Sequence, residues 1–422
     1  MPDLHELHRH ARAIFHHALS AVDPRPKVKA ALTDLKISAP IYSIAIGKAA
    51  TSMALGLDDA LGDKLSAGVI VSTSLHQSSR WQSFIGGHPL PNESSLAAAR
   101  STFELLDRAN HEQGTIIFLI SGGGSAMIEW PITDDISLDD LRLANQTLVS
   151  CGASISEINS VRRAFSAVKG GGLARRAQNA TMFTLIVSDT NSLDEANVAS
   201  GPTLKPPTHA PSAIDVIHHH HLQTELPESI MKAVRRAKRS SAHVSGEYWL
   251  LLDNKTAIVA AHHKANELGY PCSTVYDIRE QPIQIGCEML LASVDHVNFE
   301  RFASASGGEF SCRVRGDGRG GRNLETALRC AILLDKQNNT RSHLVVLSAG
   351  TDGIDGNSPA AGAIADETTL QRAQNLNLDA AQYLARSDSY TFFEQLNDLI
   401  ITGPTGTNVR DLRILLKSLD RF

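Results

Sequence analysis

The sequence lacks the features that would place it in a membrane, a disulfide framework or a cysteine metal site. No run of about 18 or more apolar residues is present, so no segment is predicted to cross a bilayer as a helix. The five cysteines form no C-x-x-C pair, which is typical of a protein from a reducing compartment. The first residues contain no apolar core of signal-peptide length. We therefore expect a cytoplasmic protein with no membrane association.

An excess of positive charge is also missing. The formal net charge is −5, which argues against a general nucleic-acid or anionic-membrane partner, and no nucleic-acid motif is present. With 42% hydrophobic and 20% charged residues, the composition is that of an ordinary globular protein. A chain of 422 residues exceeds one ordinary hydrophobic core, so we expect two domains.

What the sequence does contain is an alternation of short apolar runs with helical patterns. Residues 1–20 carry apolar positions at helical spacing and predict an amphipathic first helix. Near-continuous apolar runs follow at 40–47, 67–73, 115–125 and 182–189, with helical patterns between them. Strands of this kind indicate a parallel α/β sheet with both faces covered by helices.

A second alternating series begins near residue 245, after a connecting stretch at 204–240 that is rich in proline and basic residues. It contains a helical pattern near 283–296 and a strand pattern at 342–350. These features predict an N-terminal Rossmann-like domain over 1–240 and a smaller α/β domain over 241–407. Residues 408–422 are predicted to form a helix that completes the first domain.

Polar and glycine-rich segments follow several predicted strands, where open α/β sheets bind ligands. SGGGS at 121–125 offers backbone amides that can approach an anion, although a tight turn is an alternative interpretation. It has neither the P-loop nor the dinucleotide-binding glycine spacing. Lys48 follows the strand pattern IAIG and is placed to contact a phosphate or carboxylate, or else to lie in solvent.

Acidic residues follow two other strand patterns. Asp189 comes directly after one of them, where a carboxylate can hold Mg²⁺, accept a substrate proton or cap a helix. Asp352 lies in the second acidic segment, at 350–366, whose spacing is too irregular for an EF-hand. No glycine–aspartate repeat continues that segment, so a calcium solenoid is disfavoured.

Three further segments invite a binding interpretation. RGDGRGGRNLE at 315–325 suits a surface turn, a calcium loop or a binding loop for an anion, and the missing repeat disfavours the calcium loop. His88 lies between glycine and proline, which predicts a fixed loop. The run His218–His221 has no neighbouring cysteine or carboxylate in the sequence and is predicted to face solvent.

Taken together, these residues leave two chemistries open. The cationic candidates are Lys48, Lys169, Arg315, Arg319 and Arg322, and they accompany glycine-rich loops and acidic residues. That combination suits phosphoryl transfer, which depends on charge neutralisation and positioning. It suits equally a dehydrogenase that holds a carboxylate substrate beside a nucleotide.

Motifs along nearly the whole chain resemble those of class II glycerate kinases with an MOFRL-type C-terminal domain. In order, they are IAIGKAA, GGHPLPNESS, ISGGGSAM, NSVRRAFSAVKGGGLAR, SD…ASGPT, GGE, GxGRGGRNLE, SAGTDGIDG…AAGAIAD, SDSYTFF and TGPTGTNVRDL. The resemblance implies ATP- and Mg²⁺-dependent phosphorylation of D-glycerate at its 2-hydroxyl. It also implies an active site in the cleft between the two domains, and we expect a homodimer.

The same resemblance assigns residue roles. Lys48, Asp189 and Arg322 match catalytic positions, with Arg322 reaching across the cleft to a phosphate or carboxylate, and Asp189 acting as base or metal ligand. Asp352 is a second candidate for the metal. The candidates for binding substrate or phosphate are Ser121, Gly122, Gly123, Gly124, Ser125, His88, Lys169 and Asn323.

Three departures from the family pattern bear on the substrate. The segment after Asp189 reads TNSLDEAN, Phe310 replaces a threonine, and Gly171 replaces an arginine. A related small sugar acid is therefore an alternative substrate. Hydroxypyruvate reductase is an alternative activity, although no nicotinamide-binding G-x-G-x-x-G follows the first strand. A catalytically inactive ligand-binding protein is a third interpretation.

Overall fold

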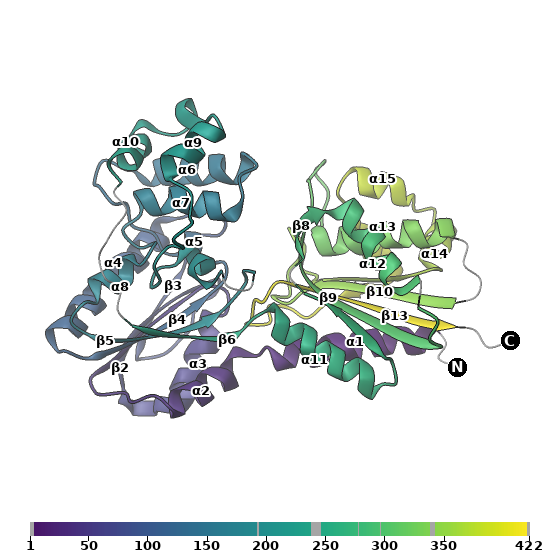
Figure 1. Ribbon diagram of the computed structural model, residues 1–422, viewed down its shortest axis with the longest axis horizontal. Helices are drawn as coiled ribbons and strands as arrows, with labels where there is room; N and C mark the ends of the chain where they lie inside the picture. Colours follow the sequence, from purple (N-terminus) through teal and green to yellow (C-terminus); the bar gives the residue numbers. More distant parts are fainter. Residues whose placement is uncertain are drawn as a thin grey trace. The chain divides into compact units, whose positions relative to one another are not determined.

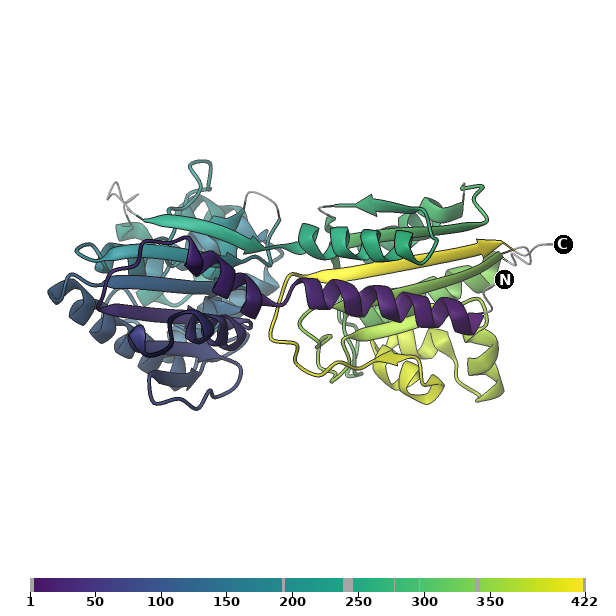
Figure 2. The ribbon, with the colours of Figure 1, turned by 90° about the horizontal axis from the view of Figure 1, so that it is seen from below.

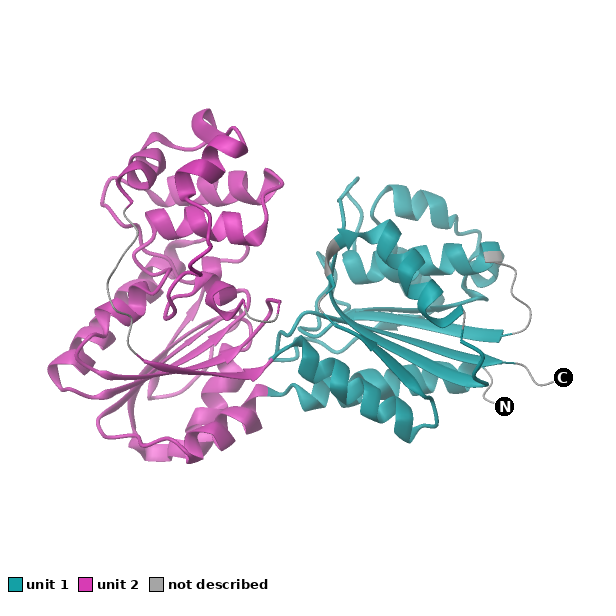
Figure 3. Cartoon of the chain, in the orientation of Figure 1, with its two compact units in different colours: residues 1–23, 253–422 teal, residues 24–252 magenta. Residues whose placement is uncertain are grey.

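A computed structural model describes residues 4–191, 194–237, 246–276, 278–295, 297–337 and 342–419. The chain forms two compact units, coloured separately in Figure 3. One consists of Pro24–Leu252 and is called the central unit below. The other combines Met1–Asp23 with Asp253–Phe422 and is called the terminal unit. Within the described residues, no helix is long and apolar enough to cross a membrane.

This division corrects the predicted domain boundaries. The predicted boundary at 240/241 lies outside the described residues, and the chain passes from one unit to the other between Leu252 and Asp253. The first helix, α1 (Leu4–Ala21), belongs to the terminal unit, because its apolar side packs there on α11 (Asn254–Glu267). The sequence predicted the helix correctly but not its partner, which lies more than two hundred residues away.

The sheet of the central unit is entirely parallel. Its strands are β1 (Ile41–Ile46), β2 (Leu65–Ser72), β3 (Trp81–Ile85), β4 (Thr115–Ser121), β5 (Thr181–Val187) and β6 (Glu247–Leu252). Their order across the sheet is β3-β2-β1-β4-β5-β6, the order of doubly wound nucleotide-binding sheets. The predicted parallel α/β fold is confirmed. The sequence missed β3, a short edge strand with partly exposed residues, and it assigned the segment that forms β6 to the second domain.

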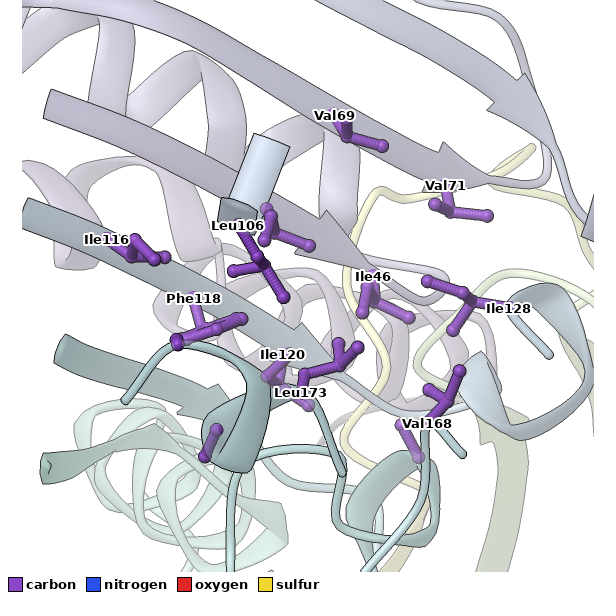
Figure 4. Packing of buried hydrophobic residues seen from close by; sticks show 14 of the residues in the cluster. Ile46, Val69, Val71, Leu106, Ile116, Phe118, Ile120, Ile128, Val168 and Leu173 are labelled. Atoms are coloured by element: carbon purple, nitrogen blue, oxygen red, sulfur yellow. The ribbon is translucent and has the colours of Figure 1, made fainter. Parts of the chain in front are cut away.

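Helices cover both faces of this sheet, as Figure 1 shows. They are α2 (Pro24–Thr33), α3 (Ala50–Leu61), α4 (Glu93–His111), α5 (Gly124–Met127) and α8 (Gly172–Arg176), with the 3-10 helices η1 (Gly62–Lys64) and η2 (Glu195–Ser200). Alternate strand residues such as Ile46, Val71 and Phe118 pack against α4 and α8, in the core drawn in Figure 4. Apolar residues of this size each contribute roughly 1.5–3 kcal/mol when fully buried.

A separate helical layer lies beyond the sheet of the central unit (Figure 1). It contains α6 (Leu138–Ser150), α7 (Ile155–Phe165), α9 (Ala213–His219), η3 (Leu222–Thr224) and α10 (Glu228–Arg236). Their facing sides share one apolar cluster that includes Leu148, Val161 and Ile217. The side chain of Ser137 caps α6 and that of Ser154 caps α7, and each helix has a complete capping box.

The sheet of the terminal unit is mixed and mainly antiparallel. Its strands are β7 (Cys272–Val275), β8 (Arg279–Pro282), β9 (Arg301–Ser311), β10 (Ser342–Gly350), β11 (Gly362–Asp366), β12 (Leu399–Ile400) and β13 (Asp411–Leu419). The order is β12-β11-β10-β13-β9-β7, and β8 also pairs with β9. Among the described strands, β7 and β8 each pair with β9 in parallel, and the other paired strands are antiparallel.

Helices also cover both faces of the terminal sheet. One face packs on α1 and α11, which lie side by side in Figure 2. The other face packs on α12 (Ile283–Asp295), α13 (Arg322–Gln337), α14 (Thr369–Asn375) and α16 (Ser389–Leu396), with α15 (Ala380–Ala385) beyond them. The predicted α/β class is therefore confirmed for this unit, although its sheet is not a parallel one.

The predicted C-terminal helix over 408–422 is wrong for the described residues, because 411–419 form strand β13 at the centre of the terminal sheet. Arg413 and Lys417 are spaced four apart, which is also the spacing of residues on one side of a helix. Both are buried: Arg413 stacks on the Phe310 ring at 4.1 Å, and the Lys417 ammonium donates to the Val294 carbonyl at 3.0 Å. A strand buried on both faces has no apolar alternation that would distinguish it from a helix.

Candidate functional site

The strand order of the central unit fixes where a ligand would bind. The chain runs from β1 outward through β2 to β3, and then returns to β4 and continues outward on the other side. The carboxyl ends of β1 and β4 therefore form the switch point at which doubly wound sheets bind ligands. The segments at this edge are Gly47–Lys48 after β1, 122–125 after β4, and Ser188–Asp189 after β5.

Hydrogen bonds join the first two of these segments. The Lys48 amide donates to the Gly122 carbonyl at 2.9 Å, and the Ala49 amide donates to the Ser121 hydroxyl oxygen at 3.0 Å. The same hydroxyl donates to the Ile46 carbonyl at 3.1 Å. Ser121 is fully buried, so its side chain fixes the geometry of the switch point.

Two glycines allow Lys48 and Asp189 to approach the same turn. A Cβ on Gly122 would lie 1.9 Å from Asp189 Oδ2, and a Cβ on Gly123 would lie 2.9 Å from Lys48 Cγ. The Gly123 amide also donates to Asp189 Oδ2 at 3.2 Å. The structure thus places Lys48 and Asp189 on either side of Gly122–Gly123, although 141 residues separate them in the sequence.

The next two predicted residues of this segment have packing roles. A Cβ on Gly124 would lie 2.8 Å from Ile46 Cγ2 and 2.9 Å from the Cβ of Ala199, so this glycine is required for close packing. The hydroxyls of Ser125 and Ser200 lie 2.9 Å apart. Ser125 is half-buried, and its hydroxyl contacts protein through Ser200.

Sequence reasoning missed the polar network around Ser200. The Ser200 hydroxyl donates to Asn159 Oδ1 at 2.7 Å, and the Arg163 guanidinium donates to Asn197 Oδ1 at 2.7 Å. Ala199 and Ser200 both have positive φ, at 49° and 62°, a backbone conformation uncommon outside glycine. The motifs NSVRRAF and ASGPT were recognised, but nothing in the sequence showed that they contact each other.

Two other predicted binding residues lie elsewhere in the central unit. Lys169 is 1% exposed and forms an ion pair with Glu129, which is equally buried. Burial lowers the pKa of Lys169 despite the opposite effect of Glu129. His88 is exposed in the segment after β3, which is fixed by a bond from the Gly87 amide to the Ser95 hydroxyl oxygen at 3.0 Å.

In the terminal unit, Arg322 begins α13 and is held by two carboxylates. Its Nε donates to Asp411 Oδ2 at 2.6 Å, and its Nη2 donates to Glu309 Oε1 at 2.7 Å. Burial acts against its charge, but Asp411 and Glu309 more than compensate and raise the pKa of Arg322. The side chain remains 37% exposed, so part of it faces solvent.

Asn323 and Asp355 anchor the start of the same helix. The amides of Asn323 and Leu324 donate to the Asp355 carboxylate at 3.1 and 2.8 Å, which satisfies two unpaired donors at the helix start. Asn323 is 2% exposed, and its side chain contacts Asp355 and Ser348. Burial raises the pKa of Asp355 to about 7, against the effect of the two amides.

The glycine-rich segment before Arg322 is anchored to neighbouring loops. Arg319 lies 4.3 Å over the Tyr390 ring, and the Gly318 amide donates to the Arg386 carbonyl at 3.1 Å. The Gly320 amide donates to Asn357 Oδ1 at 2.8 Å. Arg315 is exposed. This arrangement positions Arg322 and gives Arg319 a structural contact.

Two remaining sequence features have local explanations. The Asp352 carboxylate is half-buried and accepts the Ile354 amide at 3.2 Å, which is compatible with either a turn or a metal ligand. Phe310, the departure in the GGE motif, is buried between Gly286 and the Arg413 guanidinium. The Phe310 ring is therefore part of the hydrophobic core.

The comparisons with known proteins agree with this architecture. A family profile described as a domain of unknown function, DUF4147, matches residues 10–235, and the MOFRL family profile matches residues 302–411. A Thermotoga maritima protein named D-glycerate 2-kinase is 34% identical over 98% of this chain and 99% of its own length. The chain belongs to the class II glycerate kinase family.

Other members of the family carry two different names. A Pyrococcus horikoshii glycerate 2-kinase is 31% identical over 92% of this chain and 90% of its own length. An Agrobacterium vitis protein provisionally named hydroxypyruvate reductase is 34% identical over 96% and 93%. The solved structure of a Thermotoga maritima glycerate kinase matches with a TM-score of 0.83 and 32% identity, over 98% of this chain and 99% of that one.

Proposed function

We propose that this chain is a kinase that transfers the γ-phosphoryl group of ATP to the 2-hydroxyl of D-glycerate, giving 2-phosphoglycerate and ADP. Family membership supports the reaction class. The observation that carries the residue assignment is the convergence of Lys48 and Asp189 on the Gly122–Gly123 turn at the switch point of the central sheet.

Lys48 supplies positive charge at this edge. In a phosphoryl transfer the negative charge is spread over the transferred group and the two oxygens in line with it. An ammonium fixed beside a glycine turn can stabilise that charge at short range, because no Cβ keeps the phosphate away from the backbone. The hydrogen bond from the Lys48 amide to Gly122 holds its backbone in place before the substrate arrives.

Asp189 has two candidate roles, as a general base or as a metal ligand. As a base it would orient the 2-hydroxyl of glycerate and accept its proton. As a ligand it would hold Mg²⁺, which prefers carboxylate oxygens together with the phosphate oxygens of ATP. A bound Mg²⁺ would supply charge neutralisation on the phosphates. Asp352, in the terminal unit, is a separate candidate for binding a metal ion.

Arg322 is the proposed anion-binding residue of the terminal unit. A guanidinium can contact a carboxylate or phosphate through two parallel hydrogen bonds, which suits either glycerate or ATP. Asp411 and Glu309 orient it from one side, so it is presented in a fixed direction. His88, the amides of the 122–125 segment and Asn323 remain candidates for binding or positioning.

The alternative activity is the reductase that two Agrobacterium vitis relatives are named for. The strand order of the central unit is compatible with a dinucleotide, but two features disfavour it. The turn after β1 reads GKAAT, which lacks the glycine spacing, and β2 ends at Ser72 where such sites place an acid for the ribose.

The deciding experiment is ³¹P NMR of the purified full chain with ATP, Mg²⁺ and D-glycerate. We expect ADP and 2-phosphoglycerate to appear together, and the chemical shift separates this product from 3-phosphoglycerate. A parallel assay follows NADH and NADPH oxidation with hydroxypyruvate. Oxidation without ADP formation would overturn the kinase proposal. A panel of three- and four-carbon hydroxy acids then tests the substrate.

A further inference from the structure

The run His218–His221 lies at the C-terminal end of α9 in the helical layer, where α9 ends at His219. The sequence offered no carboxylate beside it, but the fold supplies one. Glu157 lies in the first turn of α7, and α7 and α9 pack together through the apolar cluster of this layer. Glu157 Oε1 is consequently 3.4 Å from His220 Nε2, across 63 residues of sequence.

Three ligand atoms converge at this point. One atom each from Glu157, His219 and His220 can be chosen so that all three lie within 4.8 Å of one another. Two ligands of a tetrahedral zinc ion, each about 2.0–2.2 Å from the metal, lie about 3.3–3.5 Å apart. The Glu157–His220 pair already has this separation, and a ligand atom of His219 lies within 4.8 Å of both.

The carboxylate is oriented for such a contact. Glu157 Oε2 accepts hydrogen bonds from both the amide and the hydroxyl of Ser154, each 2.8 Å long, while Oε1 points to His220. A ligand held from behind in this way resembles the hydrogen-bonded ligands of protein metal sites.

We propose that Glu157, His219 and His220 bind a divalent first-row transition metal ion, with Zn²⁺ as the representative, and with water completing its coordination. Two imidazoles and one carboxylate suit Zn²⁺, Co²⁺ or Ni²⁺, whereas Mg²⁺ prefers oxygen ligands alone. The ion joins the start of α7 to the end of α9. It stabilises the helical layer and is independent of the proposed kinase chemistry.

The test is isothermal titration of the full chain with ZnCl₂ in the presence of excess Mg²⁺, which fills oxygen-ligand sites. We expect one Zn²⁺ per chain and a higher melting temperature. His219→Ala combined with His220→Ala should abolish binding. Glu157→Gln should weaken it by at least about tenfold, because even the outer partners of metal ligands contribute 10–100-fold.

The matched control is the adjacent pair His262 and His263 on α11, of which the first is half-buried and the second exposed. Among the described residues, they belong to no three-ligand group within reach of one ion. Replacing both with alanine should leave the titration unchanged. Equal losses in the two double variants, or full affinity in Glu157→Gln, would overturn the three-ligand site. The Co²⁺ absorption spectrum of the wild type supplies a second readout.

Discussion

In the central unit every strand of the sheet runs in the same direction, whereas in the terminal unit most neighbouring strands are antiparallel. In the parallel sheet all the carboxyl ends lie at one edge. The segments after β1, β4 and β5 are therefore brought together by the strand direction alone. In the antiparallel sheet the end of one strand lies beside the start of the next. Asp411 at the start of β13 accordingly pairs with Gly308 near the end of β9.

The two units also differ in the interactions that position their candidate site residues. Lys48 and Asp189 are placed by glycines, which remove steric bulk from the turn between them. Arg322 is placed by charge, through Asp411 and Glu309. Asp411 is 2% exposed, and Arg322, with help from Arg413, lowers the pKa of Asp411 although burial acts in the opposite direction. We therefore expect substitutions to affect mainly turnover in the central unit and stability as well in the terminal unit.

The largest expected effect is on stability, from Asp411→Ala. The change removes the buried carboxylate partner of Arg322. Breaking a fully buried ion pair costs about 3–5 kcal/mol, and the cost here is smaller because Arg322 is 37% exposed and keeps Glu309. Hydrogen exchange followed by mass spectrometry should show faster exchange in β9 and β13, with the central sheet unaffected. Asp189→Ala is the matched variant and should leave exchange in both sheets close to wild type. Similar destabilisation in the two variants would contradict the expected difference in stability effects between the terminal and the central unit.

Lys48→Ala should lower turnover about a hundredfold or more, because it removes charge that stabilises the transition state. The melting temperature should stay close to wild type, since Lys48 is held by its backbone. Arg322→Ala should lower turnover to a similar extent and also destabilise the terminal unit. Steady-state kinetics and differential scanning calorimetry measure both quantities. Near-normal turnover in both variants would remove these catalytic assignments.

Acid should weaken the terminal unit through Asp366, which bonds His8 of α1 at 2.7 Å. Burial opposes ionisation, but bonds from His8 and Thr368 lower the pKa of Asp366 to about 2. A carboxylate with a lowered pKa stabilises the fold above its unfolded pKa of about 4, and loses this contribution as the pH falls to about 2. The loss is about 2 kcal/mol.

Chemical denaturation across this pH range, with exchange in α1 as the local readout, measures the acid effect. Asp366→Asn should flatten the dependence, since the variant has no carboxylate to protonate. A wild-type α1 that stays fully protected down to pH 2, or an unchanged slope in the variant, would show that this pair does not hold α1.

The smallest expected effect comes from Ser125→Ala. It removes one hydroxyl contact with Ser200, a change of about 0.5–1.5 kcal/mol in the free energy of unfolding. Turnover should fall by only a small part of the Lys48→Ala effect, because the hydroxyl contacts protein. Urea denaturation and kinetics check the two values. A loss of turnover as large as that of Lys48→Ala would instead place the Ser125 hydroxyl on the substrate.

The sequence was informative where local pattern and strand direction decide the outcome. Near-continuous apolar runs predicted the parallel strands, and their direction made it possible to expect Lys48, Gly122, Gly123 and Asp189 at one edge. It failed where a residue's partner is distant. Lys169 resembled a phosphate-binding cation, but its ammonium forms a buried ion pair with Glu129.

The sequence by itself determined the fold class, the family and the residue types at the switch point, because periodicity, composition and motif order are properties of the chain. Only the tertiary structure decided that α1 belongs with Asp253–Phe422, that Arg413 and Lys417 are buried in a strand, and that Glu157 contacts His220. Each of these depends on which apolar surfaces pack together. That packing depends on the free energy of the whole unit, which cannot be worked out from a local sequence pattern.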